Sequence, residues 1–88
     1  MRLSALLKEG AQLIDVRSIA EFSAAANHLS RNIPLSEISP RINELNPEKP
    51  VIVCCASGGR SGVAATILRS SGFKNVINAG SWKNTLLS

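Results

Sequence analysis

Two adjacent cysteines, Cys54 and Cys55, stand where a short apolar run meets a glycine-rich segment. The run, residues 51–54, is typical of a buried strand because it is bounded and contains β-branched residues. Residues 62–71 carry apolar residues at helical spacing, which predicts a helix. Cys55 therefore lies in a turn between a strand and a helix, where backbone N–H groups and the positive end of the helix dipole stabilise a thiolate. We predict that Cys55 is a nucleophile.

Cys54 has a different sequence environment. It continues the apolar strand, and a buried cysteine usually acts as a small hydrophobic residue. That interpretation suits Cys55 less well, because Cys55 begins the glycine turn.

Strands and helices alternate along the chain, which predicts an α/β fold with a small parallel sheet of four to five strands, flanked by helices on both faces. We expect Ser18 and Glu21 to form a capping box before one of the helices, and a connector with a short strand over residues 27–36. Glycines close the first and last helices, at Gly10 and Gly72. Strands are expected at residues 12–17, 51–54 and 76–78, and helices at residues 2–9, 19–26, 40–45 and 62–71.

Asp15 and Arg17 end the first predicted strand. The carboxyl ends of strands line the binding crevices of α/β proteins, so these residues are candidates for supporting the site. The alternative is that Asp15 caps or pairs locally. The sequence leaves both open.

Composition limits the classes of function. The 88 residues are 44% hydrophobic and 18% charged, which indicates one folded domain over residues 1–88 and not a disordered chain. The net charge is +4, but the basic residues are scattered and only three residues are aromatic, so we expect no nucleic-acid partner. The positive charge would instead draw small anions to a site.

Further expectations concern location and ligands. No apolar stretch approaches the roughly 18–20 residues of a membrane helix, and residues 1–10 lack the apolar centre of a signal peptide, so we expect a cytoplasmic protein that binds no membrane. Two adjacent cysteines and one histidine offer neither a disulfide framework nor zinc-ligand spacing. We expect free thiols, no metal, no other cofactor and a monomer.

The chain resembles the rhodanese family, in particular its small single-domain members of the phage-shock type. Residues 55–62, C-A-S-G-G-R-S-G, match the family's active-site loop pattern C-x-x-G-x-R-S-G. Ala56 stands where many members carry a basic residue. The other matching blocks are residues 13–17 with 21–22, residues 32–35, and residues 72–76 with 78–80.

The resemblance implies a sulfurtransferase. Cys55 would take a sulfane sulfur from a small anionic donor such as thiosulfate, hold it as a persulfide and pass it to cyanide or a thiol. Backbone N–H groups of the loop would stabilise the negative terminal sulfur, while Arg60 would either attract the donor or point into solvent. The implied active-site loop consists of Ala56, Ser57, Gly58, Gly59, Arg60 and Ser61.

Two other functions remain open. Cys54 to Arg60 has the C-x5-R spacing of Cys-dependent phosphatases and arsenate reductases, in which Cys54 would be the nucleophile. Alternatively, the chain is a non-catalytic rhodanese-like binding module whose loop is a docking surface. Cys54 could also resolve an oxidised Cys55, although a disulfide between neighbours in sequence is strained.

Overall fold

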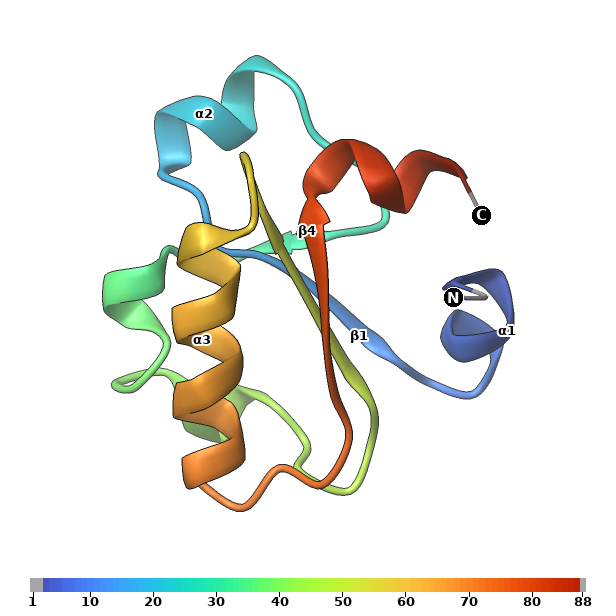
Figure 1. Cartoon of the computed structure of the whole chain (residues 1–88), viewed down its shortest axis with the longest axis vertical. Coiled ribbons are helices and arrows are strands. Elements are labelled where there is room, and N and C mark those ends of the chain that lie inside the picture. Colours follow the sequence, from blue (N-terminus) through green and yellow to red (C-terminus); the bar gives the residue numbers. More distant parts are fainter. Residues whose placement is uncertain (1–2, 88) are drawn as a thin grey trace.

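Four parallel strands form the centre of the computed structural model, which describes residues 3–87 (Figure 1). Their order in the sheet is β2-β1-β3-β4, so β3 lies between β1 and β4. The predicted parallel α/β sheet is confirmed, with four strands. The strands are β1 (Gln12–Asp15), β2 (Arg31–Asn32), β3 (Val51–Cys55) and β4 (Val76–Ser81).

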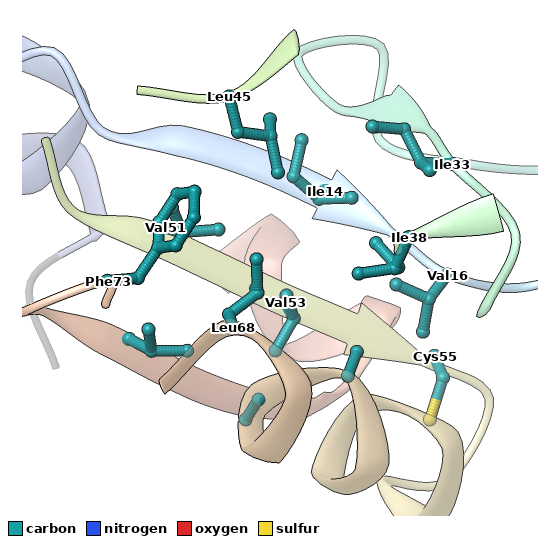
Figure 2. Close-up of a cluster of buried hydrophobic side chains, with 13 residues drawn as sticks. Ile14, Val16, Ile33, Ile38, Leu45, Val51, Val53, Cys55, Leu68 and Phe73 are labelled. Atoms are coloured by element: carbon teal, nitrogen blue, oxygen red, sulfur yellow. The ribbon is translucent and has the colours of Figure 1, made fainter. Parts of the chain in front are cut away.

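The central strand β3 is buried along its whole length. Successive side chains of a strand point to opposite faces. Val51, Val53 and Cys55 accordingly belong to the larger core cluster, whereas Ile52 belongs to a smaller cluster on the other face. Figure 2 shows Val53 and Cys55 on the side of the sheet that the long helix covers. A strand buried on both faces accounts for the continuous apolar run in the sequence.

Helices cover both faces of the sheet, as predicted. The helix α3 (Gly59–Ser70) packs on one face, together with the 3-10 turns η1 (Leu35–Glu37) and η2 (Ile42–Glu44). The helix α1 (Leu3–Lys8) packs on the other face around Leu13 and Ile52. No helix in the described part of the chain is long and apolar enough to cross a membrane.

The helix α2 (Ile19–Ala24) follows the carboxyl end of β1. The predicted capping box is present: the hydroxyl of Ser18 accepts a hydrogen bond from the backbone N–H of Glu21 at 3.2 Å, and the Glu21 carboxylate accepts one from the N–H of Ser18 at 3.0 Å. This fixes the direction in which the chain leaves the sheet. The last element, η3 (Trp82–Leu87), is a 3-10 segment that follows β4 directly.

Some predicted boundaries are wrong. The expected helix over residues 40–45 is instead a turn followed by η2, because a segment this short, with proline at its start and Pro47 just beyond it, makes too few helical hydrogen bonds to propagate. The helix expected at 62–71 begins three residues earlier, at Gly59, and β4 extends to Ser81 instead of ending at Asn78. Arg2, expected to begin the first helix, lies outside the described residues.

Candidate active site

Cys55 is the last residue of β3, and its sulfur faces the first turn of α3 (Figure 2). The backbone N–H of Gly58 donates a hydrogen bond to the sulfur at 2.9 Å. We expected Cys55 to begin the turn and to be less buried than Cys54. Instead, the two residues are equally buried, at 1% exposure each. The reason is the extension of β4, in which Ser81 lies beside Cys55 and keeps it in the sheet.

The loop between β3 and α3 turns sharply around the sulfur. Gly58 has φ +106°, in the left-handed region that favours glycine, and it precedes the first residue of α3, Gly59. This conformation lets the N–H of Gly58 point back at the cysteine. Ala56 and Ser57 are exposed, so one side of the loop is open to solvent. Of the predicted loop residues, Gly58 and Ser61 therefore lie directly against the sulfur.

Hydrogen bonds lower the pKa of Cys55 despite its burial. Burial alone raises this pKa, because it disfavours the charged thiolate. Hydrogen bonds that the thiolate accepts from the Ser61 hydroxyl and from the backbone N–H groups of Ser61, Gly58 and Ser57 act in the opposite direction and outweigh the burial. The pKa of Cys55 is lowered as a result, which is the condition for a thiolate nucleophile.

The hydroxyl of Ser61 lies between the sulfur and Asn78. Its oxygen is 3.4 Å from Cys55 Sγ and 2.6 Å from Asn78 Oδ1. The sequence analysis did not identify Asn78 as a site residue. The available signal was the spacing of Asn78 and Gly80, because an asparagine two residues before a glycine is typical of a side chain that bonds its own backbone. This bond is present, from the N–H of Gly80 to Asn78 Oδ1 at 2.9 Å.

Arg60 forms an ion pair with Glu21, which the sequence analysis assigned only to the capping box. Nη1 of Arg60 is 2.6 Å from Oε1 of Glu21, and Nη2 is 2.9 Å from Oε2. Because of Arg60, above all through its hydrogen bond, the pKa of Glu21 is lowered to about 2. The guanidinium of Arg60 is therefore neither free in solvent nor unpaired and directed at the loop, the two arrangements expected from the sequence. Its charge is compensated in this arrangement.

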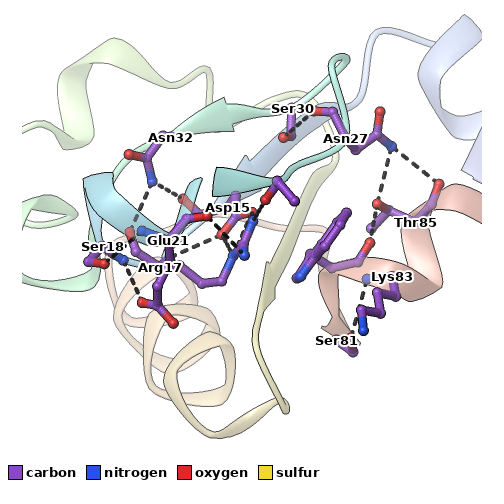
Figure 3. A network of polar contacts seen from close by, with 12 residues as sticks. Asp15, Arg17, Ser18, Glu21, Asn27, Ser30, Asn32, Ser81, Lys83 and Thr85 are labelled. Carbon is purple, nitrogen blue, oxygen red and sulfur yellow. Dashed lines mark hydrogen bonds and ion pairs between the residues drawn. The ribbon is translucent and has the colours of Figure 1, made fainter. Parts of the chain in front are cut away.

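Asp15 and Arg17 form a buried ion pair (Figure 3). Nη2 of Arg17 is 2.6 Å from Oδ2 of Asp15, and the side chains are 6% and 0% exposed. The same guanidinium nitrogen donates to the carbonyl of Ala25 at 2.8 Å, and the guanidinium lies 4.8 Å from the ring centroid of Trp82. The pair thus joins β1 to the end of α2 and to η3. Asp15 neighbours Cys54 in the sheet, so it lies on the opposite face from the sulfur of Cys55.

Cys54 points away from the loop. It neighbours Asp15 and Gly80 in the sheet, on the face opposite to Cys55. Burial first, and then the negative charge of Asp15, raise the pKa of Cys54 to about 12. This position argues against a C-x5-R nucleophile and against a Cys54–Cys55 disulfide. Within residues 3–87, no three His, Cys, Asp or Glu side chains are grouped as a metal site would require.

The fold and the site together define an α/β protein with a thiol site between a central parallel strand and the start of a helix. The chain belongs to the rhodanese-like domain family, whose model matches residues 2–85. The similarity thus covers nearly the whole chain.

Individual relatives agree with the family. The uncharacterized protein YqhL of Bacillus subtilis is 46% identical over 68 residues, which are 77% of this chain and 54% of YqhL, so the chain spans about half of that relative. The thiosulfate sulfurtransferase GlpE of Pseudomonas syringae is 33% identical, with 92% of this chain and 80% of GlpE covered. The human single-domain sulfurtransferase TSTD1 superposes with a TM-score of 0.81 at 29% identity, covering 96% of this chain and 88% of TSTD1.

Proposed function

We propose that the chain is a sulfurtransferase in which Cys55 carries a sulfane sulfur as a persulfide. The observation that carries this proposal is the hydrogen bond from the Gly58 N–H to the Cys55 sulfur, in a loop that lowers the pKa of the thiol. The printed names of GlpE and TSTD1, both sulfurtransferases, support the same class. The proposed partners are a small anionic donor such as thiosulfate and a thiophilic acceptor, cyanide or a thiol.

The reaction takes place in two displacement steps. The Cys55 thiolate attacks the outer sulfur of thiosulfate, the S–S bond of the donor breaks, and sulfite leaves with the bonding electron pair. Cys55 then holds a persulfide whose terminal sulfur is negatively charged. Cyanide attacks that terminal sulfur, the S–S bond of the persulfide breaks, and thiocyanate leaves while the Cys55 thiolate is restored.

The loop residues have separate roles in this scheme. The N–H groups of Ser57, Gly58 and Ser61 stabilise negative charge on sulfur, in the same way that an oxyanion hole stabilises oxygen. The 12-residue helix α3 adds the positive end of its dipole. Ala56 leaves the exposed side of the loop uncharged. The buried pair of Asp15 and Arg17 supports the site indirectly, by joining the elements beneath it.

The proposal is tested by measuring thiocyanate formed from thiosulfate and cyanide. We expect wild type and Cys54→Ser to be active and Cys55→Ser to be inactive. A phosphate-ester assay on the same three proteins tests the alternative nucleophile. Ester hydrolysis that is lost only in Cys54→Ser would overturn the proposal in favour of a phosphatase.

Persulfide formation separates an enzyme from a binding module. After incubation with thiosulfate and removal of the donor, intact-mass spectrometry should show a gain of one sulfur atom in wild type and none in Cys55→Ser. The extra sulfur should leave on addition of cyanide. A folded wild-type protein that never gains the sulfur, from thiosulfate or from a low-molecular-weight persulfide, would contradict the proposal.

A further inference from the structure

The hydroxyl of Ser61 has one proton and three polar neighbours. Its oxygen lies 2.6 Å from Asn78 Oδ1, 3.2 Å from the carbonyl oxygen of Gly58 and 3.4 Å from the sulfur of Cys55. Ser61 is fully buried, so water does not add a donor. The single proton goes to one of these neighbours at a time.

The neighbour that receives the proton is Asn78. The N–H of Gly80 donates to the side chain of Asn78 at 2.9 Å, so the atom in that position is the amide oxygen and not the amide nitrogen. A carbonyl oxygen only accepts hydrogen bonds, and 2.6 Å is a short O–H···O distance. Ser61 therefore donates to Asn78, and in the neutral state the Cys55 thiol donates to Ser61.

A local irregularity of β4 holds Asn78 in this position. Val53 lies beside Asn78 in the sheet, but the next residue of β3, Cys54, lies beside Gly80, so Ala79 is an extra residue in β4. Gly80 has φ +77°, in the left-handed region. Such bulges redirect side chains next to active sites. Here the bulge directs the Asn78 amide across to α3, where Ser61 is its partner.

We infer that Asn78 is a positioning residue of the sulfur-transfer site, which competes with the Cys55 sulfur for the single proton of Ser61. The inference deepens the proposed function and rests on it. When Cys55 loses its proton, the Ser61 hydroxyl has to rotate from Asn78 to the sulfur in order to stabilise the thiolate. When the persulfide forms, the negative charge moves to the outer sulfur, and the hydroxyl returns to Asn78. Asn78 thus raises the free energy of the Cys55 thiolate, before sulfur is bound, relative to that of the neutral thiol.

The charged groups around Cys55 are the same in all the Asn78 and Ser61 variants that carry an uncharged replacement. β4, which carries Asn78, has no titratable residue. The titratable residues on the other elements packed around the site are Asp15, Arg17, Glu21, Glu37, Cys54, Arg60, Arg69 and Lys83. A pH shift between the uncharged Asn78 variants is therefore assigned to the Ser61 hydroxyl.

The test is the pH dependence of alkylation by iodoacetamide, which reacts with the thiolate. All proteins carry Cys54→Ala, so that only Cys55 reacts. We expect Asn78→Ala to lower the pH midpoint by about one unit, a tenfold gain in thiolate below the midpoint, because the short hydrogen bond to Asn78 no longer has to break before Ser61 donates to the sulfur. Ser61→Ala should raise the midpoint. Since Asn78 acts through Ser61, the double variant should match Ser61→Ala alone.

Further controls separate positioning from folding. Thermal melting shows whether each variant is folded, and a structural role alone would change the melting temperature without moving the pH midpoint. If Asn78→Ala does not fold, Asn78→Ser also removes the amide oxygen and should shift the midpoint in the same direction. Asn78→Asp keeps acceptor oxygens for Ser61 and Gly80 and adds a negative charge near the sulfur, and for both reasons its midpoint should not fall below that of the parent.

The inference is overturned if folded Asn78→Ala, or Asn78→Ser in its place, has the midpoint of the parent or a higher one, or if the double variant differs from Ser61→Ala. Alkylation reports the thiolate and not sulfur transfer. A protein that transfers no sulfur but shows the expected midpoints therefore rejects the proposed function and supports the competition for the Ser61 proton.

Discussion

Arg60 and Glu21 are joined by two short contacts, Nη1 to Oε1 at 2.6 Å and Nη2 to Oε2 at 2.9 Å. The ion pair connects the first turn of α3 to the first turn of α2, which lie 39 residues apart in the sequence. Arg60 is the cationic residue of the loop. The negative charge of Glu21 therefore reduces the electrostatic attraction between Arg60 and an anionic donor.

Glu21→Gln should lower the KM for thiosulfate by about threefold at low salt, because it removes the carboxylate that compensates Arg60. Glutamine also forms capping boxes, so the start of α2 is kept. Arg60→Gln should raise the KM instead. The measurement is steady-state formation of thiocyanate at increasing thiosulfate concentration, at low and at high ionic strength.

A matched control for this prediction is Glu48→Gln. It makes the same chemical change and breaks the exposed ion pair between Glu48 and Lys74. Glu48 precedes β3 and Lys74 precedes β4, so this pair lies at the end of the sheet opposite to the active-site loop. Its KM should equal that of wild type. A Glu21→Gln protein whose KM is unchanged or higher would show that the compensated charge does not limit donor binding.

The ion pair of Arg60 and Glu21 also predicts how the folding stability of the chain depends on pH. The Arg60 guanidinium holds the pKa of Glu21 at about 2 in the folded chain, compared with a usual value of 4.5. A lowered folded-state pKa gives stability that is fully present above pH 4.5 and is lost as the pH falls toward 2. The melting temperature of wild type should therefore exceed that of Glu21→Gln by a constant amount above pH 5, and the difference should disappear near pH 2. A difference that grows on acidification would contradict this assignment. 

The fold was predictable from the sequence because its main signals are local. The buried strand β3 is a continuous apolar run. The capping box of Ser18 and Glu21 lies within four consecutive residues, so it can be recognised from the local sequence. The start of α3 was predicted three residues late because residues 59–61 carry no apolar side chain, so apolar spacing does not show that the helix begins directly after Gly58.

The candidate site was predictable only in part, for a similar reason. The loop from Cys55 to Ser61 is contiguous, so its residues could be found together. Glu21 and Asn78 reach the loop through tertiary contacts across 39 and 17 residues, and no local pattern indicates such partners. The opposite directions of Cys54 and Cys55 follow from strand alternation, once Cys55 is known to belong to the strand.

Gly58 and Gly59 should respond differently to the same substitution. Gly58→Ala places a side chain at φ +106°, which costs about 1–2 kcal/mol, and it should slow sulfur transfer by disturbing the N–H that points at the sulfur. Gly59→Ala adds a methyl group with nothing within 4 Å at the first residue of α3, so it should not destabilise the chain and should gain at most the roughly 0.5–1 kcal/mol by which alanine is favoured within a helix. Urea unfolding and the thiocyanate assay measure both effects. Equal behaviour of the two variants would argue against the strained turn.

Asp15→Asn should destabilise the chain by about 3–5 kcal/mol, because it leaves the guanidinium of Arg17 buried without its counter-charge. The double variant Asp15→Leu/Arg17→Met should lose less, since no buried charge then remains unpaired. Urea unfolding at pH 7 measures both.

The exposed pairs of Glu44 with Arg31 and Arg41 give the control for Asp15. Glu44→Gln should cost about 0–1 kcal/mol, because solvent screens these pairs. A loss in Asp15→Asn no greater than this would mean that the buried pair does not hold the fold together. Because Asp15 lies on the opposite face of the sheet from the Cys55 sulfur, the folded fraction of Asp15→Asn at low temperature should still transfer sulfur. Its activity should fall with the fraction of folded protein, whereas that of Gly58→Ala should fall while the protein remains folded.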